Sequence, residues 1–89
     1  MKTSKSLSFG DLSFRWIDAN GPSLGLVVSK KYGNAVQRNL FKRRCRSIFK
    51  SVIIDRGSEI SIIVRPKSQN IPFSSIYSSF SSIYEKYSN

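Results

Sequence analysis

The stretch Lys30–Arg46, KKYGNAVQRNLFKRRCR, decides most of what this sequence predicts about its fold. Asn34 suits the N-cap of a helix, because its side chain can accept a hydrogen bond from the free amides of the first turn. From there the apolar residues recur at helical spacing and fall in one stripe: Phe41, Cys45, Ile48, Phe49 and Val52. The stretch therefore predicts a helix that begins after Asn34, runs to about Val52 and packs one face on a sheet.

A second stripe of the predicted helix is cationic. Its members recur every four residues and therefore stack into one row: Arg38, Lys42, Arg46 and Lys50. Arg43 covers the neighbouring arc. Unpaired like charges in a row repel one another unless an anion lies along them, and a phosphate backbone is the anion that fits. The free amides at the helix start offer one more phosphate contact, with a plain helix cap as the alternative.

The composition supports an anionic partner. The chain has 89 residues, which suits a single domain over residues 1–89. Fifteen Lys and Arg against five Asp and Glu give a net charge of +10, and eight of the fifteen lie between Lys30 and Lys50. Such clustering favours an RNA-binding domain whose affinity falls with salt. A basic surface that only keeps the protein soluble is the alternative.

The residues that most protein catalysis requires are scarce. There is no histidine, and the five acids are scattered at spacings that form no metal-binding pair. Cys45 is the one cysteine and lies on the apolar stripe, so we expect a small buried side chain in a reducing cytoplasm. No apolar run is long enough to span a bilayer. We therefore predict no catalytic residue, no metal site in the protein and no membrane or small-molecule partner.

Strand patterns flank the predicted helix. Residues 12–17 alternate, with Leu12, Phe14 and Trp16 on one face. Residues 24–30 are almost continuously apolar, which favours burial on both faces or a central place in the sheet. Residues 60–65 alternate again, and residues 73–87 place apolar side chains at helical spacing. The order strand-strand-helix-strand-helix predicts an α+β fold, a single-domain sandwich of one small mixed sheet with a central basic helix.

The aromatic side chains of the first predicted strand allow two interpretations. Phe14 and Trp16 alternate with Ser13 and Arg15, so on an open sheet face they would stack on unpaired bases. Under a helix they would instead form part of the core. The pattern alone leaves both interpretations open.

Several short segments between Gly25 and Arg46 follow one another in an order that is typical of a known protein family. The segments GLVVSKK (Gly25–Lys31) and GNAV (Gly33–Val36) are followed by Arg38-Asn39, Lys42-Arg43 and Arg46. This order resembles the signature of the protein subunit of bacterial ribonuclease P, closely over residues 24–49. The element order fits that family through to the C-terminus.

The resemblance implies a function that composition cannot. It implies binding to the ribonuclease P RNA and to the 5′ leader of precursor tRNA, so that the protein is one component of a tRNA-maturing endoribonuclease. The RNA carries out the catalysis and binds most of the magnesium. The positions carried over as RNA-binding are Arg38, Asn39, Lys42, Arg43 and Arg46, with Lys30 and Lys31 nearby. Lys50 joins the predicted RNA-binding residues by its place in the cationic row. Phe14 and Trp16 would be the leader-stacking residues.

Two departures from the family pattern stand out. Leu40 takes the place of the second arginine of an Arg-Asn-Arg signature, and Arg44 lies in the next turn on a different arc. Few residues precede the predicted first strand, so we expect the family fold without its N-terminal helix, either because the chain is a reduced version or because its start is assigned late. The resemblance also implies an uncommon left-handed strand-helix-strand crossover. A small ribosomal-type or general RNA-binding protein, and a protein nuclease, are the alternative functions.

Overall fold

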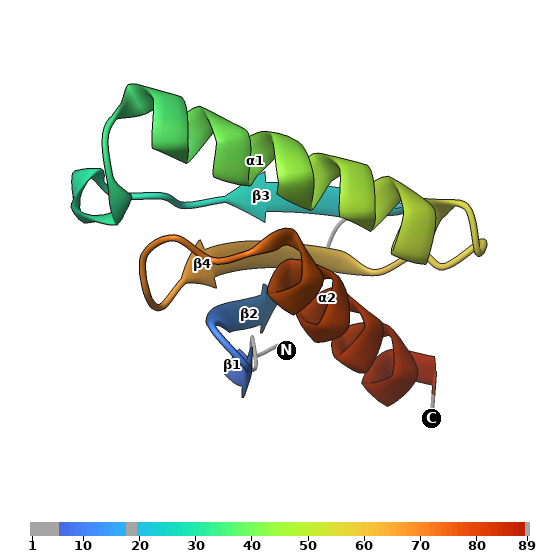
Figure 1. Ribbon diagram of the computed structural model, residues 1–89. Coiled ribbons are helices and arrows are strands. Elements are labelled where there is room, and N and C mark those ends of the chain that lie inside the picture. Colours follow the sequence, from blue (N-terminus) through green and yellow to red (C-terminus); the bar gives the residue numbers. More distant parts are fainter. Residues whose placement is uncertain (1–5, 18–19, 89) are drawn as a thin grey trace.

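The protein folds into one mixed sheet covered by two helices (Figure 1). The computed structural model describes residues 6–17 and 20–88. Its strands are β1 (Ser6–Phe9), β2 (Leu12–Trp16), β3 (Ser23–Leu26) and β4 (Ser61–Pro66). Its helical elements are the 3₁₀ turn η1 (Lys30–Tyr32), α1 (Ala35–Phe49), the π-helical turn η2 (Lys50–Ile54) and α2 (Phe73–Ser88). The predicted α+β class, mixed sheet and central basic helix are confirmed.

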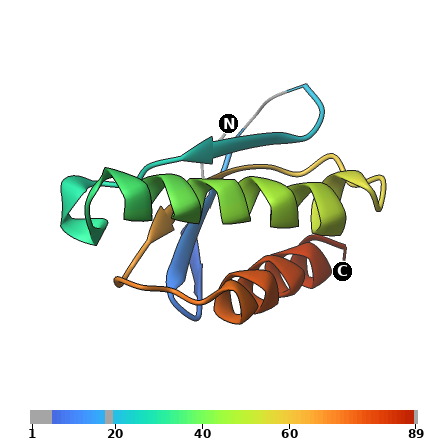
Figure 2. The same ribbon diagram turned by 45° about the horizontal axis from the view of Figure 1, so that its top comes forward.

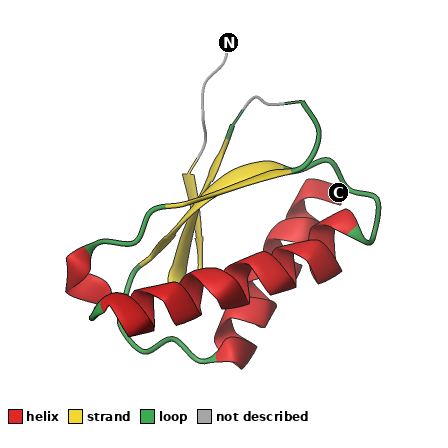
Figure 3. Ribbon diagram, turned by 90° about the horizontal axis from the view of Figure 1, so that it is seen from above, coloured by secondary structure: helices red, strands yellow, loops and turns green. Residues whose placement is uncertain are grey.

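The topology leaves one face of the sheet uncovered within the described residues. The strand order is β1-β2-β4-β3, with β3 parallel to β4 and the other neighbouring pairs antiparallel. Helix α1 connects the parallel strands β3 and β4, and this crossover is left-handed, as the resemblance implies (Figure 1). Figures 2 and 3 show α1 and α2 side by side on the same side of the strands. Side chains on the opposite side therefore meet no other element of this part of the chain.

Two strand predictions need correction. Strand β1 precedes the strand predicted as the first and forms a hairpin with β2 through Gly10, whose φ of 56° suits glycine. Its four residues are too short a pattern to separate from a loop by alternation. Strand β3 is shorter than predicted and lies at the sheet edge, not in its centre. Its apolar run is half-buried by α1 on one face, whereas Val27 just beyond it is exposed.

The core lies between the sheet and both helices. Leu12, Phe14, Ile62 and Val64 supply its sheet side. The predicted stripe of α1 is buried from Phe41 onward, and α2 adds Ile76, Phe80 and Ile83. The Phe80 ring lies edge-on to Phe14 at 5.3 Å and to Phe49 at 6.4 Å between centroids, so it joins both helices to the sheet.

The ends of α1 explain its position. Asn34 is the N-cap, as predicted: its side chain accepts from the Gln37 amide, and the Gln37 side chain accepts from the Asn34 amide, each at 2.9 Å. After Phe49 the chain continues as the π-helical turn η2 and not as the regular α-helix predicted to Val52. Val52 and Ile53 remain buried there. In the described part of the chain, no helix has the length and apolar character needed to cross a membrane.

Candidate nucleic-acid interface

Helix α1 exposes its predicted RNA-binding residues because its opposite stripe is fixed in the core. Asn39, Arg43 and Arg46 are exposed, while Arg38 and Lys42 are half-buried on the flank. None of these four cations forms an ion pair within the described residues. The outer surface of α1 therefore carries uncompensated positive charge, which favours a polyanion along it.

Arg38 has a second role inside the chain. Its Nη1 donates a hydrogen bond of 2.7 Å to the carbonyl oxygen of Gly33. Gly33 is the C-cap of η1, the turn that carries the exposed Lys30 and Lys31. Arg38 thus fixes this turn to α1 while a part of its side chain stays accessible.

Lys50 differs from the other predicted cations. Its Nζ lies 3.1 Å from Oδ1 of Asp55, across the π-helical turn, and forms an ion pair with it. Both side chains are more than half exposed, so water and salt screen this pair strongly. The positive row on α1 therefore ends at a residue whose charge is partly compensated.

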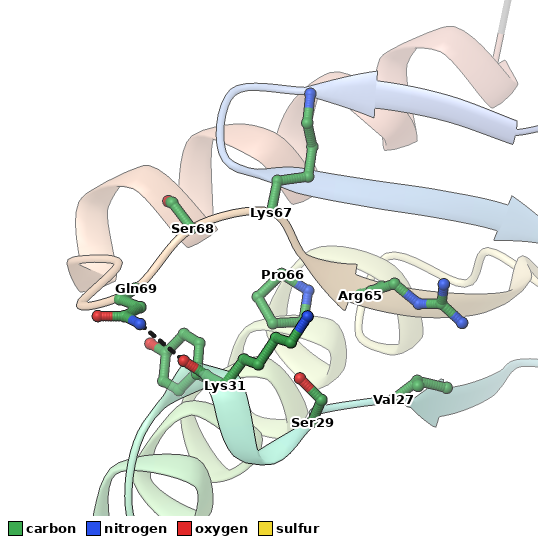
Figure 4. A pocket seen from close by; sticks show the side chains of 9 residues that line it. Val27, Ser29, Lys31, Arg65, Pro66, Lys67, Ser68 and Gln69 are labelled. Atoms are coloured by element: carbon green, nitrogen blue, oxygen red, sulfur yellow. Dashed lines mark hydrogen bonds between the residues drawn. The ribbon is translucent and has the colours of Figure 1, made fainter.

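A cationic hollow lies where β3 and β4 end (Figure 4). Its volume is about 610 Å³, and its lining includes Lys31 from η1, Arg65 from β4 and Lys67 from the following loop. The Gln69 side chain donates to the Lys31 carbonyl oxygen at 2.7 Å and joins this loop to η1. Among residues 6–17 and 20–88, no acidic side chain lines the hollow. Its three cations make it the second positive surface of the molecule.

Arg65 and Lys67 were not among the predicted RNA-binding residues. The strand register shows where Arg65 lies. Arg65 pairs with Ser13, and Arg15 pairs with Ile63. Both arginines therefore lie on the uncovered face of the sheet. Alternation had placed Arg15 and Arg65 opposite the apolar faces of their strands. That they share one surface follows only from the pairing of β2 with β4.

The predicted stacking residues belong to the covered face of the sheet. Phe14 is 1% exposed and contacts the rings of Phe9 and Phe80, so a base cannot stack on it. The stacking prediction for Phe14 is therefore wrong, because both helices lie over its side of β2. Trp16 is half-buried and packs against the same core, and its stacking role stays a prediction.

Two features bear on chemistry at this surface: clusters of metal-ligating side chains and the single cysteine. The described residues bring no three His, Cys, Asp or Glu side chains together. Cys45 is fully buried, as predicted, and this burial raises the pKa of its thiol to about 12, against a smaller lowering by Arg46. At neutral pH the thiol is therefore protonated and is no nucleophile. The features that remain are the exposed cations of α1 and the cationic hollow, and both suit the binding of an anionic partner.

Comparison with known proteins assigns this surface to a family. The sequence matches the Ribonuclease P family over residues 1–88. This chain belongs to the ribonuclease P protein family. The ribonuclease P protein component of Finegoldia magna is 34% identical over 71 residues, which are 78% of this chain and 63% of that protein. The chain thus spans less than two thirds of that relative's length.

Solved structures of the family share this fold. The RNase P protein of Staphylococcus aureus aligns with a TM-score of 0.73 and 26% identity, over 94% of this chain and 81% of that one. The RNase P protein of Thermotoga maritima aligns with a TM-score of 0.69 and 27% identity, over 93% and 83%. The family and fold implied by the Lys30–Arg46 stretch are both confirmed.

Proposed function

We propose that this chain is the protein component of ribonuclease P, binding the catalytic RNA and the 5′ leader of precursor tRNA. The observation that carries the proposal is the cationic surface of α1, whose residues Arg38–Arg46 form no ion pair with any described residue, on a member of this family. In this role the protein contributes binding while the RNA cleaves.

The RNA subunit is the proposed partner of α1. Arg43, in the second half of α1, and Arg46, in its last turn, are exposed on a helix whose opposite stripe is buried in the core, and Asn39 adds a polar group one turn before Arg43. Phosphate contacts from such a helix give affinity and orientation with little sequence preference. That suits a protein that recognises the shape of a structured RNA.

The leader is the proposed partner of the cationic hollow and of the adjoining open sheet face. A single-stranded leader is flexible and exposes its phosphates, so Lys31, Arg65 and Lys67 would follow its backbone. Arg15 extends the positive charge along the same face. Two separate surfaces would allow one small protein to hold the catalytic RNA and its substrate together.

Magnesium is proposed to belong to the RNA. The described residues offer no carboxylate cluster of the kind that holds this ion in proteins, so the protein's donor set does not fit a magnesium site. By neutralising phosphates with Lys and Arg, the protein would lower the magnesium concentration that the RNA needs to fold and bind its substrate.

The test is cleavage of precursor tRNA by the isolated RNA subunit at low magnesium, with and without this chain. Restored cleavage at the mature 5′ end supports the proposal. A general RNA-binding protein would bind the RNA without restoring cleavage. Cleavage by the purified protein after removal of all contaminating RNA would identify a protein nuclease and overturn the proposal.

A further inference from the structure

A smaller hollow, of about 190 Å³, lies on the flank of α1 opposite the Arg38–Lys42–Arg46 row. It opens between α1 and residues 70–72, the turn that leads into α2. Its floor consists of the buried side chains Tyr32, Phe41 and Ile71. The Tyr32 ring packs on Phe41 at 5.0 Å between centroids, and its hydroxyl accepts from the Ile71 amide at 3.3 Å. The floor is therefore apolar, and Tyr32 is held both by Phe41 of α1 and by Ile71 of the turn before α2.

The rim adds one apolar wall and two unused donors. Leu40 is 37% exposed and forms the apolar wall. Arg44 is half-buried beside it, with no ion pair or hydrogen bond to any described residue. Gln37 uses its Oε1 to accept from the Asn34 amide, which leaves its side-chain NH₂ without a partner in the same set. The part of the chain that the structure describes contributes no acidic side chain to the lining of this hollow.

This combination selects one class of ligand. A phosphate alone needs donors but gains nothing from an apolar floor. An aliphatic side chain of a partner protein needs the floor but leaves Arg44 and Gln37 desolvated and unpaired. An unpaired nucleobase has apolar faces for the floor, acceptor atoms on its edge for the donors, and a phosphate within the same nucleotide for a cation.

We propose that this hollow binds one unpaired nucleobase of an RNA strand, packed on Leu40 and the floor, with Arg44 and Gln37 donating to its acceptors. The inference rests on the proposed function and refines it. The base would come from the RNA subunit or from precursor tRNA, which share this chemistry.

The experiment is chemical probing of base edges in each RNA, bound to the wild-type chain or to Leu40→Trp, which fills the hollow. We expect the wild type to protect at least one unpaired base that Leu40→Trp exposes again, with affinity about tenfold lower. The salt dependence of binding should not change, because a base contact releases no counterions. The RNA that shows the change identifies the source of the base.

Val36→Trp is the matched control. Val36 is 75% exposed, lies one turn before Leu40 and lines no part of the hollow, so this variant should bind and protect like the wild type. Unchanged affinity and protection with Leu40→Trp would overturn the proposal, as would equal losses with both tryptophan variants. If Leu40→Trp does not fold, Arg44→Gln takes its place and should expose the same base.

A second probe separates this inference from the proposed function. A short single-stranded RNA containing 2-aminopurine should change its fluorescence with the wild type and not with Leu40→Trp, even if the RNA subunit is not the partner. If the chain restores precursor cleavage but protects no unpaired base, the proposed function stands and the hollow does not bind a base. A protein partner that Leu40→Trp releases, with no base protected, has the same consequence.

Discussion

Helices α1 and α2 lie against the same face of the sheet but differ in what covers their outer surfaces. Helix α1 carries five Lys and Arg and no acid between Ala35 and Phe49. Helix α2 is rich in serine and carries one glutamate and one lysine near its end. Both bury an apolar stripe, so packing requires only the inner face of each helix. The outer face is free to differ, and in α1 it provides the candidate RNA surface.

Two serines of α2 have hydrogen-bond partners inside the protein. Ser79 Oγ donates to the carbonyl oxygen of Phe9 at 2.8 Å, and Ser75 Oγ donates to Asp11 at 3.2 Å. These bonds fix α2 to the β1–β2 hairpin, which compensates for the low helix propensity of serine. Helix α2 therefore turns two of its hydroxyl groups toward its own chain, whereas α1 turns its cations outward. The difference predicts separate effects on stability and on RNA binding.

Phe80→Ala on α2 should have the largest effect. It should reduce stability and should not remove any contact to RNA. The Phe80 side chain is fully buried between Phe14 and Phe49, so its removal leaves a cavity and should lower the free energy of unfolding by about 3–5 kcal/mol. Urea unfolding followed by circular dichroism measures it. Tyr77→Ala, at an exposed position of the same helix, should lose far less. Equal losses would show that α2 is not held by its inner stripe.

Arg38→Ala should have the second-largest effect, because Arg38 contributes both to stability and to RNA binding. It removes a phosphate contact and also the bond to the Gly33 carbonyl, which should reduce stability by about 1–2 kcal/mol. RNA affinity should fall more than tenfold, since the turn with Lys30 and Lys31 is released. Arg38→Lys keeps the charge and should preserve the salt slope. Full stability in Arg38→Ala would contradict the structural role of this arginine.

Arg46→Ala should affect RNA binding alone. Arg46 is exposed and forms no ion pair within the described residues, so the free energy of unfolding should stay within about 0.5 kcal/mol of the wild type. Affinity for the RNA subunit should fall roughly tenfold and the salt slope by about 0.7–0.9. Titrations at several salt concentrations measure both. Lys86→Ala on α2 is the control, and an equal effect there would indicate non-specific attraction.

The same contrast explains how far the sequence could be interpreted. Helix α1 was predictable because its cap, apolar stripe and cationic row are all local patterns within about twenty residues. The family signature falls in the same stretch, so fold and family followed from it. The end of α1 was not predictable, since the π-helical turn at Lys50–Ile54 buries Val52 and Ile53 without changing the apolar pattern.

The features that the sequence did not predict correctly depend on pairing between strands that are distant in the chain. The edge position of β3, the burial of Phe14 and the shared face of Arg15 and Arg65 follow from how β4 lies between β2 and β3. Alternation tells which residues of a strand share a face, but not which face the helices cover. The cations of α1 and η1 were therefore visible in the sequence, whereas Arg65 and Lys67 of the hollow were not.

Asp55→Asn should have the smallest effect and tests where the cationic surface of α1 ends. It removes the partner of Lys50, one of the predicted RNA-binding residues, and leaves that charge uncompensated. The pair is exposed, so stability should change by less than about 0.5 kcal/mol. RNA affinity should rise about twofold if Lys50 reaches a phosphate.

Glu59→Gln makes the same change in net charge at an exposed acid that forms no ion pair in the described part of the chain. Competition binding of the three proteins at one salt concentration resolves a twofold difference. An increase with Asp55→Asn only would extend the RNA surface across η2 to Lys50. An equal increase with both would mean that net charge alone acts there, and that the RNA surface of α1 ends at Arg46.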